Sequence, residues 1–387
     1  MATSATRKTA AAKKPAASKK PLPKRTASTR ATVKKHTPVK EAAVPDFAMA
    51  EVPDKSILDG YISRTVVHSA KKKDNKSEFD VFDAALANMW NVLIEGPTGP
   101  GKTTAVQAWC AARGIRFASV SSNASAEPSQ LFGKYIVNES NTGSQFVWQH
   151  GLVSDIFLNG GALLINEMNF LPERISTVLF GPTDSRRALT LMDHKGEVLK
   201  AHRPTVLKRR GDQMIPITCW CDSPESDDCK SKWVIIIGDM NPDYEGTRPL
   251  NKAFRNRFAV QLQFDYDSAV EKLLIKSASL RIMANDIRSD DQYETPVATN
   301  MLIEFESQCE VLGIEFAKSN FINHFSPEER DVVKVVIEAY ADNIESELSD
   351  EIEADDEDDS NADAVPSVDD DAIEVDEDTF DWVQTTA

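Results

Sequence analysis

The chain has 387 residues, with 44 lysines and arginines against 61 aspartates and glutamates, so its formal net charge is −17. With 41% hydrophobic residues and 16 glycines, this composition excludes a collagen-like, wholly disordered or disulfide-scaffold protein. No apolar run reaches the roughly 18 to 20 residues of a membrane span, so we predict no membrane association.

The N-terminus lacks the apolar core of a secretory signal. Five cysteines in a chain of this length predict reduced thiols rather than a framework of disulfides. We therefore expect a cytoplasmic location.

Charge is strongly segregated along the chain. Residues 1–40 hold twelve lysines and arginines and no acid, whereas residues 341–387 hold twenty acids and no base. Both ends have too few large apolar side chains to offset the entropy of ordering, so we predict a basic disordered tail at 1–53 and an acidic one at 347–387. The basic tail could bind nucleic acid through residues 1–40 by counterion release, or could be a solvated arm that only aids solubility.

The segment between the tails is long enough for two domains. From Asp54 the pattern alternates strands with helices, which predicts a parallel α/β sheet over residues 54–267. Only helical periodicity follows, which predicts a small helical domain over residues 268–346. Within it, Ser326-Pro327-Glu328-Glu329 is the pattern of an N-cap with proline at the first helical position and an acid at the third, so we expect a long helix to begin there.

A short β-run at residues 91–95 enters a glycine-rich loop, and a helical pattern follows it. The loop consists of Gly96, Pro97, Thr98, Gly99, Pro100, Gly101, Lys102, Thr103 and Thr104. Glycines permit the tight turn in which successive backbone N–H groups face phosphate oxygens at the positive end of the next helix. In this G-x-x-x-x-G-K-T pattern Lys102 would reach the β- and γ-phosphates and Thr103 would ligate Mg²⁺, so we predict a nucleotide site.

The buried β-run at residues 160–165 ends in the polar pair Asn166 and Glu167. In P-loop ATPases the matching strand ends in Asp-Glu, where the aspartate orders the Mg²⁺ shell and the glutamate polarises the attacking water. Glu167 is in place, although it could also be a simple acid at a helix N-terminus. Asn166 has the shape of an aspartate without its charge, which predicts weaker metal binding.

A third β-run, at residues 233–238, leads into Asp239 and Asn241. Asn241 could hold the lytic water against the γ-phosphate, or could only begin a turn before Pro242. Asp239 stands on a strand that in this fold would neighbour the Asn166 strand. We hypothesise that Asp239 restores the negative charge near Mg²⁺ that Asn166 lacks.

A short helical pattern at residues 250–258 carries Arg255 and Arg257. These arginines stand too late in the chain to be local phosphate ligands. They could act on another subunit, or could form surface ion pairs with the acidic middle of the chain.

The order of these motifs resembles the AAA+ ATPases, and within them the MoxR-type group, which includes the nitric-oxide-reductase and Rubisco activators and the small ATPase subunit of cobaltochelatase. The likeness extends over about residues 54–340. It rests on the glycine-rich loop, on His150-Gly151-Leu152-Val153 before Asn159-Gly160-Gly161, on Glu167-Met168-Asn169, on Ala188-Leu189-Thr190-Leu191, on Asn241-Pro242 and on residues 253–258.

The resemblance implies an α/β P-loop fold of AAA+ type, a three-layer parallel sheet with a small C-terminal helical lid, flanked by the disordered tails. It implies that Lys102 and Thr103 bind the phosphates and Mg²⁺ of ATP. It also implies that Glu167 activates water and that Asn241 senses the γ-phosphate.

The same resemblance implies an oligomer. Arg257, with Arg255 as second candidate, would be the arginine finger that reaches the neighbouring subunit's site, so activity would need a ring, a hexamer in this family. Such a ring hydrolyses ATP and remodels a protein partner, which in relatives is often a von Willebrand A-domain protein.

Two departures keep other functions open. Asn166 replaces an aspartate, and Asn300 stands where related proteins carry the second-sensor arginine, unless Arg281 supplies that charge. The alternative is therefore a nucleotide-gated, DNA-associated scaffold with little or no hydrolysis. A motor that threads DNA through the ring is a third possibility.

Residues 188–232 resemble an insertion that opens with a hairpin. In MoxR-like rings such hairpins face the pore or a partner, so Arg209, Arg210 and Trp220 could contact a substrate, or could lie in a solvated loop.

The same insertion carries three cysteines, Cys219, Cys221 and Cys229, with His202 upstream. They could form a zinc site. Because the segment lacks a paired C-x-x-C and has acids interleaved, the spacing favours free thiols.

Overall fold

The computed structural model describes residues 50–68, 75–122, 127–140, 143–242, 250–290 and 292–358. Residues 1–49 and 359–387 are outside this part of the chain. Most of the predicted basic and acidic tails therefore lies outside the described residues, as does the expected nucleic-acid contact through residues 1–40.

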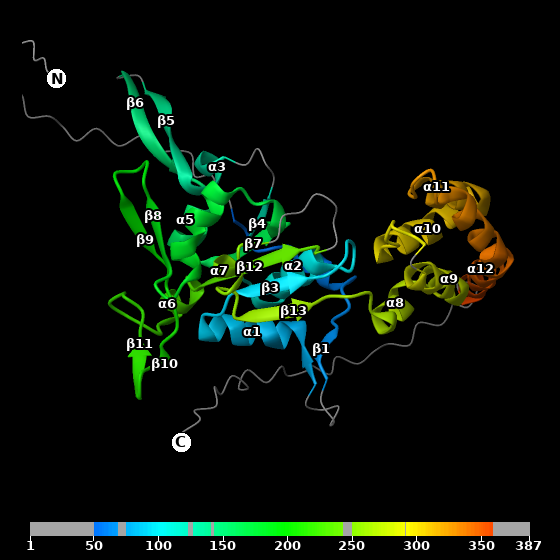
Figure 1. Cartoon of the computed structure of the whole chain (residues 1–387), viewed down its shortest axis with the longest axis horizontal. Coiled ribbons are helices and arrows are strands. Elements are labelled where there is room, and N and C mark those ends of the chain that lie inside the picture. Colours follow the sequence, from blue (N-terminus) through cyan, green and yellow to red (C-terminus); the bar gives the residue numbers. More distant parts are fainter. Residues whose placement is uncertain are drawn as a thin grey trace, which may run out of the picture. The chain divides into compact units, whose positions relative to one another are not determined.

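Five parallel strands form the central sheet, in the order β13-β3-β12-β7-β4 (Figure 1). They are β3 (Val92–Glu95), β4 (Phe117–Ser121), β7 (Gly161–Asn166), β12 (Val234–Met240) and β13 (Val260–Gln263). β12 pairs with β7 in parallel, with Gly238 opposite Ile165. The strand of Asp239 therefore neighbours the strand of Asn166, as predicted.

Helices cover both faces of the sheet, because alternate strand residues point to opposite sides. On one face Ile94, Leu164 and Ile237 pack with α1 (Glu78–Asn88) and α2 (Lys102–Arg113). On the other face Leu93, Leu163 and Ile236 pack with α4 (Leu152–Asn159) and α5 (Glu173–Thr183). These two cores confirm the predicted three-layer α/β architecture.

Short elements complete the α/β domain. Before α1 lie the 3₁₀ turn η1 (Lys55–Leu58) and the small pair β1 (Thr65–Val67) and β2 (Lys76–Ser77). Later in the chain come α3 (Pro128–Phe132), the 3₁₀ turn η3 (Met168–Phe170), α6 (Asp227–Ser231) and α7 (Lys252–Arg255).

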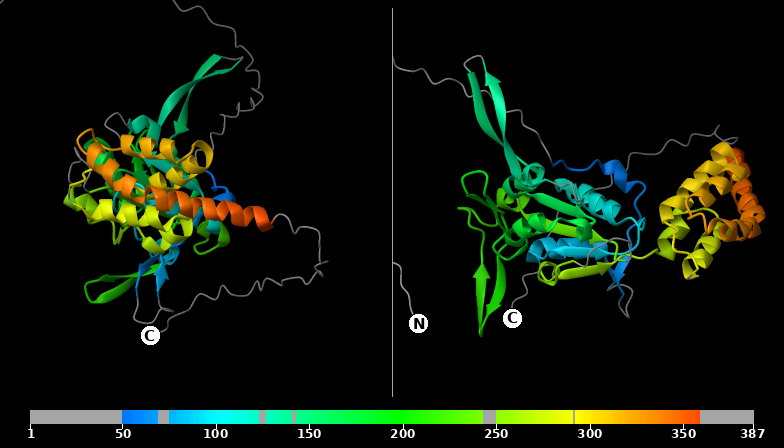
Figure 2. Two further views of the ribbon diagram at one scale, coloured as in Figure 1. Left: turned by 90° about the vertical axis from the view of Figure 1, so that its right-hand side faces the viewer. Right: turned by 45° about the horizontal axis from the view of Figure 1, so that its top comes forward.

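Three antiparallel hairpins extend from this domain (Figures 1 and 2). They are β5–β6 (Gly133–Ser140 and Gly143–His150), β8–β9 (Ala188–Leu191 and Glu197–Lys200) and β10–β11 (Val206–Arg210 and Gln213–Ile217). Trp148 of β6 stacks on His194 in the β8–β9 turn at 4.6 Å between ring centroids, so the first two hairpins contact each other. The sequence predicted a hairpin after Ala188 but not β5–β6.

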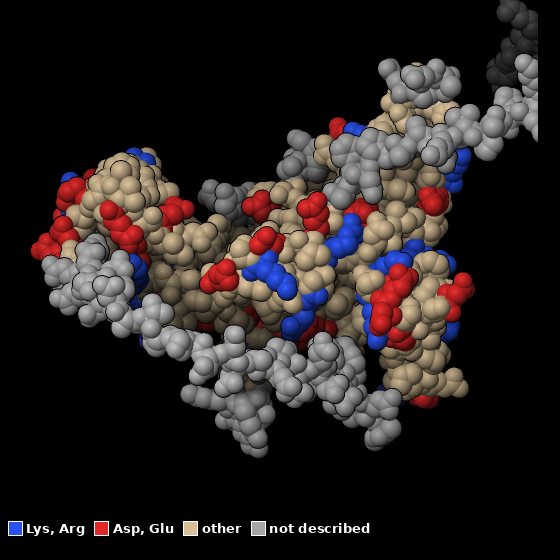
Figure 3. Space-filling view, turned by 180° about the vertical axis from the view of Figure 1, so that it is seen from behind, with Lys and Arg blue, Asp and Glu red and all other residues tan. Residues whose placement is uncertain are grey.

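The helical domain consists of α8 (Ser268–Leu274), α9 (Ala278–Ser289), α10 (Thr299–Leu312), α11 (Ile314–Asn323) and α12 (Arg330–Asp358). It has its own core, in which Leu280, Leu302, Phe321 and Ile337 are buried. The predicted helical C-terminal part is confirmed. α12 continues to Asp358, past residue 347, where the acidic disordered tail was predicted to begin. Acidic side chains are frequent on the face of this domain seen in Figure 3. Within the described residues, no helix combines the length and apolar character that crossing a membrane requires.

The start of α12 differs from the prediction. Residues 327–329 form a turn and the helix begins at Arg330. The carboxylate of Glu329 still accepts the Ser326 N–H, at 3.0 Å, as the capping pattern predicted. It also accepts the Thr295 hydroxyl, at 2.6 Å, so it joins the turn to the segment before α10.

Candidate nucleotide-binding site

The glycine-rich loop joins β3 to α2 and leaves the first turn of α2 open. Gly99 and Gly101 both have φ of +86°, a conformation that only glycine adopts without strain. Gly101 is the N-cap, and no side chain caps the helix. The first N–H groups of α2 therefore have no side-chain acceptor, and a helix N-terminus of this kind favours an anion.

Lys102, the first residue of α2, is buried. Its ammonium donates to the carbonyl oxygens of Gly96, at 2.9 Å, and Pro97, at 2.6 Å. Burial lowers the pKa of Lys102, while the carboxylates of Asp239 and Glu167 oppose that shift. The loop thus holds a cation next to its open amides.

A cleft of about 440 Å³ lies over the loop. Its lining includes loop residues 98–104 together with Asn166, Glu167, Asp239, Asn241 and Asn300. Residues from the glycine-rich loop, α2, β4, β7, β12 and α10 meet here, although long stretches of sequence separate them. The structure therefore brings together the predicted phosphate, Mg²⁺ and water-activating residues; Gly96 and Pro97 stand at the base of the loop.

Asn166 faces the loop with its oxygen. Its amide nitrogen donates to the Ser119 hydroxyl at 2.6 Å, and its Oδ1 lies 3.5 Å from Thr103 Oγ1. Two oxygens from different elements thus meet beside the phosphate-binding loop. Oxygen ligands of this kind suit Mg²⁺.

Asp239 supplies a carboxylate at the same place. It is buried, and its Oδ1 accepts the Glu167 N–H at 2.7 Å. Burial raises the pKa of Asp239, which the hydrogen bond from Glu167 and the charge of Lys102 oppose. Glu167 itself has φ of +53°, so the hydrogen bond holds a strained backbone while the Glu167 side chain remains exposed to the cleft.

Asn241 also lies at the loop, as its predicted sensor role requires. Its Nδ2 donates to Thr98 Oγ1 at 3.2 Å. Asn169 donates in turn to the Asn241 carbonyl at 3.0 Å. Thr98 thus positions the Asn241 side-chain amide, and Asn169 holds the Asn241 backbone.

The two predicted finger arginines do not line the cleft of their own chain. Arg255 forms an ion pair with Glu95, at 2.6 Å, and Arg257 lies 3.7 Å from the carboxylate of Asp184 and over the ring of Phe180. These ion pairs are the simpler alternative considered for both residues. Their action on a neighbouring subunit stays a prediction.

Asn300 lines the cleft at the position proposed for the second sensor. Arg281 instead donates to the backbone carbonyl of Ile275. Among the described residues, no arginine lines this cleft. The missing sensor charge is therefore not replaced by Arg281 in this conformation.

Two further residues, Arg64 and Tyr266, contact the loop without being predicted from the sequence. Arg64 donates to the loop carbonyl of Pro100 and stacks over Phe264, and the Tyr266 hydroxyl donates to the Thr98 carbonyl at 2.8 Å. Both residues support the loop from outside its motif. No pattern in the sequence marks them, since only the fold brings them to the loop.

A second, smaller cleft of about 140 Å³ adjoins the first and shares Gly99 to Gly101 with it. Apolar side chains contribute to its lining, among them Ile62, Val270, Leu274 and Ile303. A polar cleft over the loop thus continues into a partly apolar one.

Comparison with known proteins supports this description. The family model described as AAA domain (dynein-related subfamily) matches residues 91–258, a range that includes the glycine-rich loop and the Asn166, Glu167, Asp239 and Asn241 positions. Together with the parallel sheet, the match confirms the α/β P-loop fold of AAA type predicted from the sequence.

Similar proteins are known from staphylococci and are uncharacterized. A protein of Staphylococcus epidermidis is 26% identical over 216 residues, which cover 55% of this chain and 70% of that protein. One of Staphylococcus haemolyticus is 26% identical over 269 residues, 64% of this chain and 89% of that protein. One of Staphylococcus aureus is 28% identical over 236 residues, 60% and 76% of the two chains.

Proposed function

We propose that this chain binds ATP with Mg²⁺ and hydrolyses it, and that it does so as a ring that remodels a protein partner. The observation that carries the proposal is the meeting of Lys102, Glu167, Asp239 and Asn241 around one cleft, over a loop whose amides are open. The similarity of residues 91–258 to AAA domains supports it.

In this proposal the triphosphate lies along the loop. The open amides of α2 bind phosphate oxygens, and Lys102 exchanges its two carbonyl acceptors for the β- and γ-phosphates. The base enters the adjoining cleft, where Ile62, Val270 and Leu274 provide apolar contact.

The residues at the cleft fit Mg²⁺. The side-chain oxygens of Thr103 and Asn166 lie next to each other. Asp239 adds a buried carboxylate, whose negative charge would compensate for the charge that Asn166 lacks. These three residues would hold the ion, directly or through water. When bound, Mg²⁺ supplies positive charge to the β- and γ-phosphate oxygens.

Hydrolysis would use Glu167 and Asn241. Water attacks the γ-phosphorus in line, the bond to the β-phosphate bridging oxygen breaks, and ADP and phosphate form. Glu167 accepts the proton of the attacking water, and its exposed carboxylate in the cleft suits that role. Asn241, held next to Thr98, orients the same water against the γ-phosphate.

The ring would be a hexamer of MoxR type that acts in the cytoplasm. Arg257, or else Arg255, would leave its intramolecular ion pair and reach the site of the next subunit. A partner with a von Willebrand A domain follows from the resemblance to MoxR-type proteins. The exposed hairpins, with Arg209 and Arg210 on β10, would offer it a surface.

The alternative remains a scaffold that binds ATP and, through residues 1–40, DNA, with little or no hydrolysis. It is favoured by Asn300, which brings an uncharged amide to the cleft at the proposed sensor position. Slow turnover is the property by which it differs from the main proposal.

A phosphate-release assay separates the two. Purified full-length protein with ATP and Mg²⁺ should turn over, and Glu167→Gln should reduce the rate by about 10² to 10⁴-fold without loss of ATP binding. Glu173→Gln, at an exposed position at the start of α5, is the matched control and should leave the rate unchanged. Binding of ATP without turnover in the wild type would favour the scaffold.

A further inference from the structure

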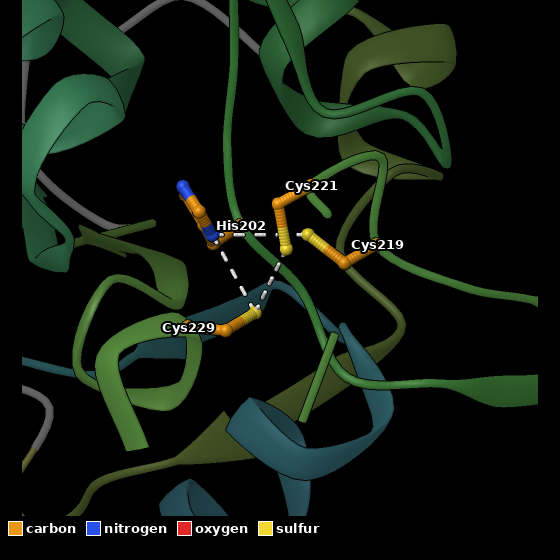
Figure 4. A group of neighbouring side chains, drawn as sticks. All are labelled: His202, Cys219, Cys221 and Cys229. Atoms are coloured by element: carbon orange, nitrogen blue, oxygen red, sulfur yellow. Dashed lines mark hydrogen bonds between the residues drawn. The ribbon is translucent and has the colours of Figure 1, made fainter. Parts of the chain in front are cut away.

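Four side chains with metal-binding atoms meet in the insertion, away from the nucleotide cleft (Figure 4). His202 follows β9, Cys219 and Cys221 follow β11, and Cys229 lies in α6. Their ligand atoms all lie within 4.8 Å of one another. In Figure 4 the three sulfur atoms and one ring nitrogen of His202 point toward a common centre.

Three distances within this Cys₃His cluster match those of a tetrahedral zinc site. Zinc bonds of about 2.3 Å to sulfur and about 2.0 Å to nitrogen place two sulfur ligands about 3.8 Å apart, and a sulfur and a nitrogen about 3.5 Å apart. Cys221 Sγ and Cys229 Sγ are 3.7 Å apart. His202 Nδ1 lies 3.4 Å from Cys229 Sγ and 3.8 Å from Cys219 Sγ. All four ligand atoms lie within 4.8 Å of one another, so adjustments of about 1 Å or less would bring the remaining pairs to the spacing of a zinc site.

The insertion has few buried residues apart from the cluster. From residue 201 to residue 233 the buried positions are Ala201, Pro204, Cys219 and Cys229, so two of the four are members of the cluster. Both strands of the β10–β11 hairpin are largely exposed. Small segments without a hydrophobic core commonly depend on a metal or on disulfides for their stability.

The cluster connects three parts of the insertion to the central sheet. His202 forms a parallel bridge with Trp233, the residue before β12. The indole N–H of Trp220 donates to the carbonyls of Lys200 and Ala201, and its ring lies 5.2 Å from that of His202. Ser226 caps α6 by accepting the Cys229 N–H at 3.1 Å. These contacts position His202 and Cys229 directly, and they hold Trp220, the residue between Cys219 and Cys221.

The sequence spacing favoured free thiols because zinc ligands commonly come in C-x-x-C pairs, and this segment has none. Here Cys219 and Cys221 are separated by Trp220 alone, and His202 and Cys229 come from elements on either side. The sequence left free thiols and a zinc site as alternatives, and the geometry of the four side chains favours the zinc site.

We propose that His202, Cys219, Cys221 and Cys229 bind one Zn²⁺ in a closed tetrahedral site. Four protein ligands leave no open coordination position, which is the arrangement of a structural zinc rather than a catalytic one. The ion fixes the β10–β11 hairpin and α6 to the beginning of β12. Zinc binding would release the thiol protons, so the affinity for zinc would increase as the pH rises.

The first test is metal content. Full-length protein expressed in zinc-replete medium should carry one zinc per chain by mass spectrometry of the metal, and protein grown with cobalt should show thiolate-to-Co²⁺ charge transfer and the intense visible bands of a tetrahedral site. Zinc below about a tenth of an ion per chain together with no such spectrum would overturn the proposal, as would an intramolecular disulfide between Cys221 and Cys229.

The second test uses variants. Cys221→Ser and Cys229→Ser should weaken zinc binding at least about tenfold, whereas Cys309→Ser, at a half-buried thiol outside the cluster, should retain one zinc. Unchanged zinc in both cluster variants would assign the ion to another place. If a variant fails to fold, alkylation of the wild type decides: Cys221 should react faster after a chelator is added, while Cys309 reacts alike in both cases. Equal rates for Cys221 with and without chelator would contradict a bound metal.

Discussion

The two ends of β12 carry two polar clusters of different origin. At its C-terminal end Asp239 enters the nucleotide cleft, and just before its first residue Trp233 bridges to His202 of the Cys₃His cluster. Most of the first cluster follows contiguous motifs at strand ends, so the sequence predicted it. The second cluster is assembled from segments whose spacing matches no familiar pattern, so the sequence could not predict its geometry.

The two clusters differ in their access to a ligand. The nucleotide cleft keeps open amides and an exposed carboxylate, which a reacting ligand needs. The Cys₃His cluster is closed, with Cys219 and Cys229 buried. We therefore expect changes at the cleft to alter turnover and changes at the cluster to alter stability.

The largest effect should come from Arg257. An arginine finger is worth about 10³ to 10⁵ in rate, so Arg257→Ala should reduce ATP turnover by at least about 10³-fold while ATP binding persists. Arg255→Ala is the comparison variant, because Arg255 also forms an ion pair, with Glu95. Turnover assays of both variants decide which arginine acts in the ring. A rate that stays within tenfold of wild type in both variants would exclude a finger at either position.

A third polar cluster, in the helical domain, offers a purely structural case. Burial alone would raise the pKa of Glu329, but hydrogen bonds from Thr295 and Ser326 outweigh it and lower the pKa to about 2. The stabilisation is present above the ordinary value of 4.5 and is lost as the pH falls from there toward 2.

Glu329→Gln should therefore lower the free energy of unfolding at pH 7 by on the order of 2 to 3 kcal/mol, and by less at pH 3. Chemical denaturation of the two proteins at both pH values measures this. Glu328→Gln is the neighbouring control, because that side chain is exposed. A destabilisation that does not shrink at low pH would show that the charge of Glu329 is not its source.

A smaller effect is expected at Asp239. Asp239→Asn keeps an oxygen that can accept the Glu167 N–H but removes the negative charge, so the Mg²⁺ concentration for half-maximal turnover should rise about tenfold. Asn166→Asp should lower it. A magnesium titration of ATP hydrolysis compares the three proteins, and an unchanged midpoint in Asp239→Asn would refute the idea that Asp239 compensates for Asn166.

The smallest effect concerns the link between the two ends of β12. Removal of zinc by a chelator should lower the thermal midpoint of unfolding, while the affinity for a non-hydrolysable ATP analogue changes by less than about threefold. A large loss of nucleotide affinity would mean that the cluster supports the cleft through β12. The separation proposed here would then be wrong.

The sequence predicted the sheet and the cleft well because local patterns determine them. Gly99 and Gly101 indicate a loop with left-handed backbone conformations. The apolar runs before Asn166 and Asp239 are typical of the buried strands of a parallel sheet. The side chains at the carboxyl ends of such strands meet at one edge, which is why distant motifs could be joined.

Other features could not be read in this way. Arg64 and Tyr266 reach the loop through tertiary contacts that no motif marks. The β5–β6 hairpin projects from the domain and leaves the apolar side chains of Val137 and Phe146 exposed, so its sequence does not show the alternation of a strand that packs on a core. The start of α12 lies after the turn at residues 327–329, where the Glu329 side chain bonds to Thr295 in the segment before α10. These contacts depend on the assembled fold.

Calorimetry of ATP binding tests the central claim most directly. Full-length protein with Mg²⁺ should bind one ATP per chain, and Lys102→Ala should weaken that binding by about tenfold or more, because it removes the charged donor at the phosphates. An absence of measurable heat with wild-type protein that is folded by circular dichroism would contradict the account.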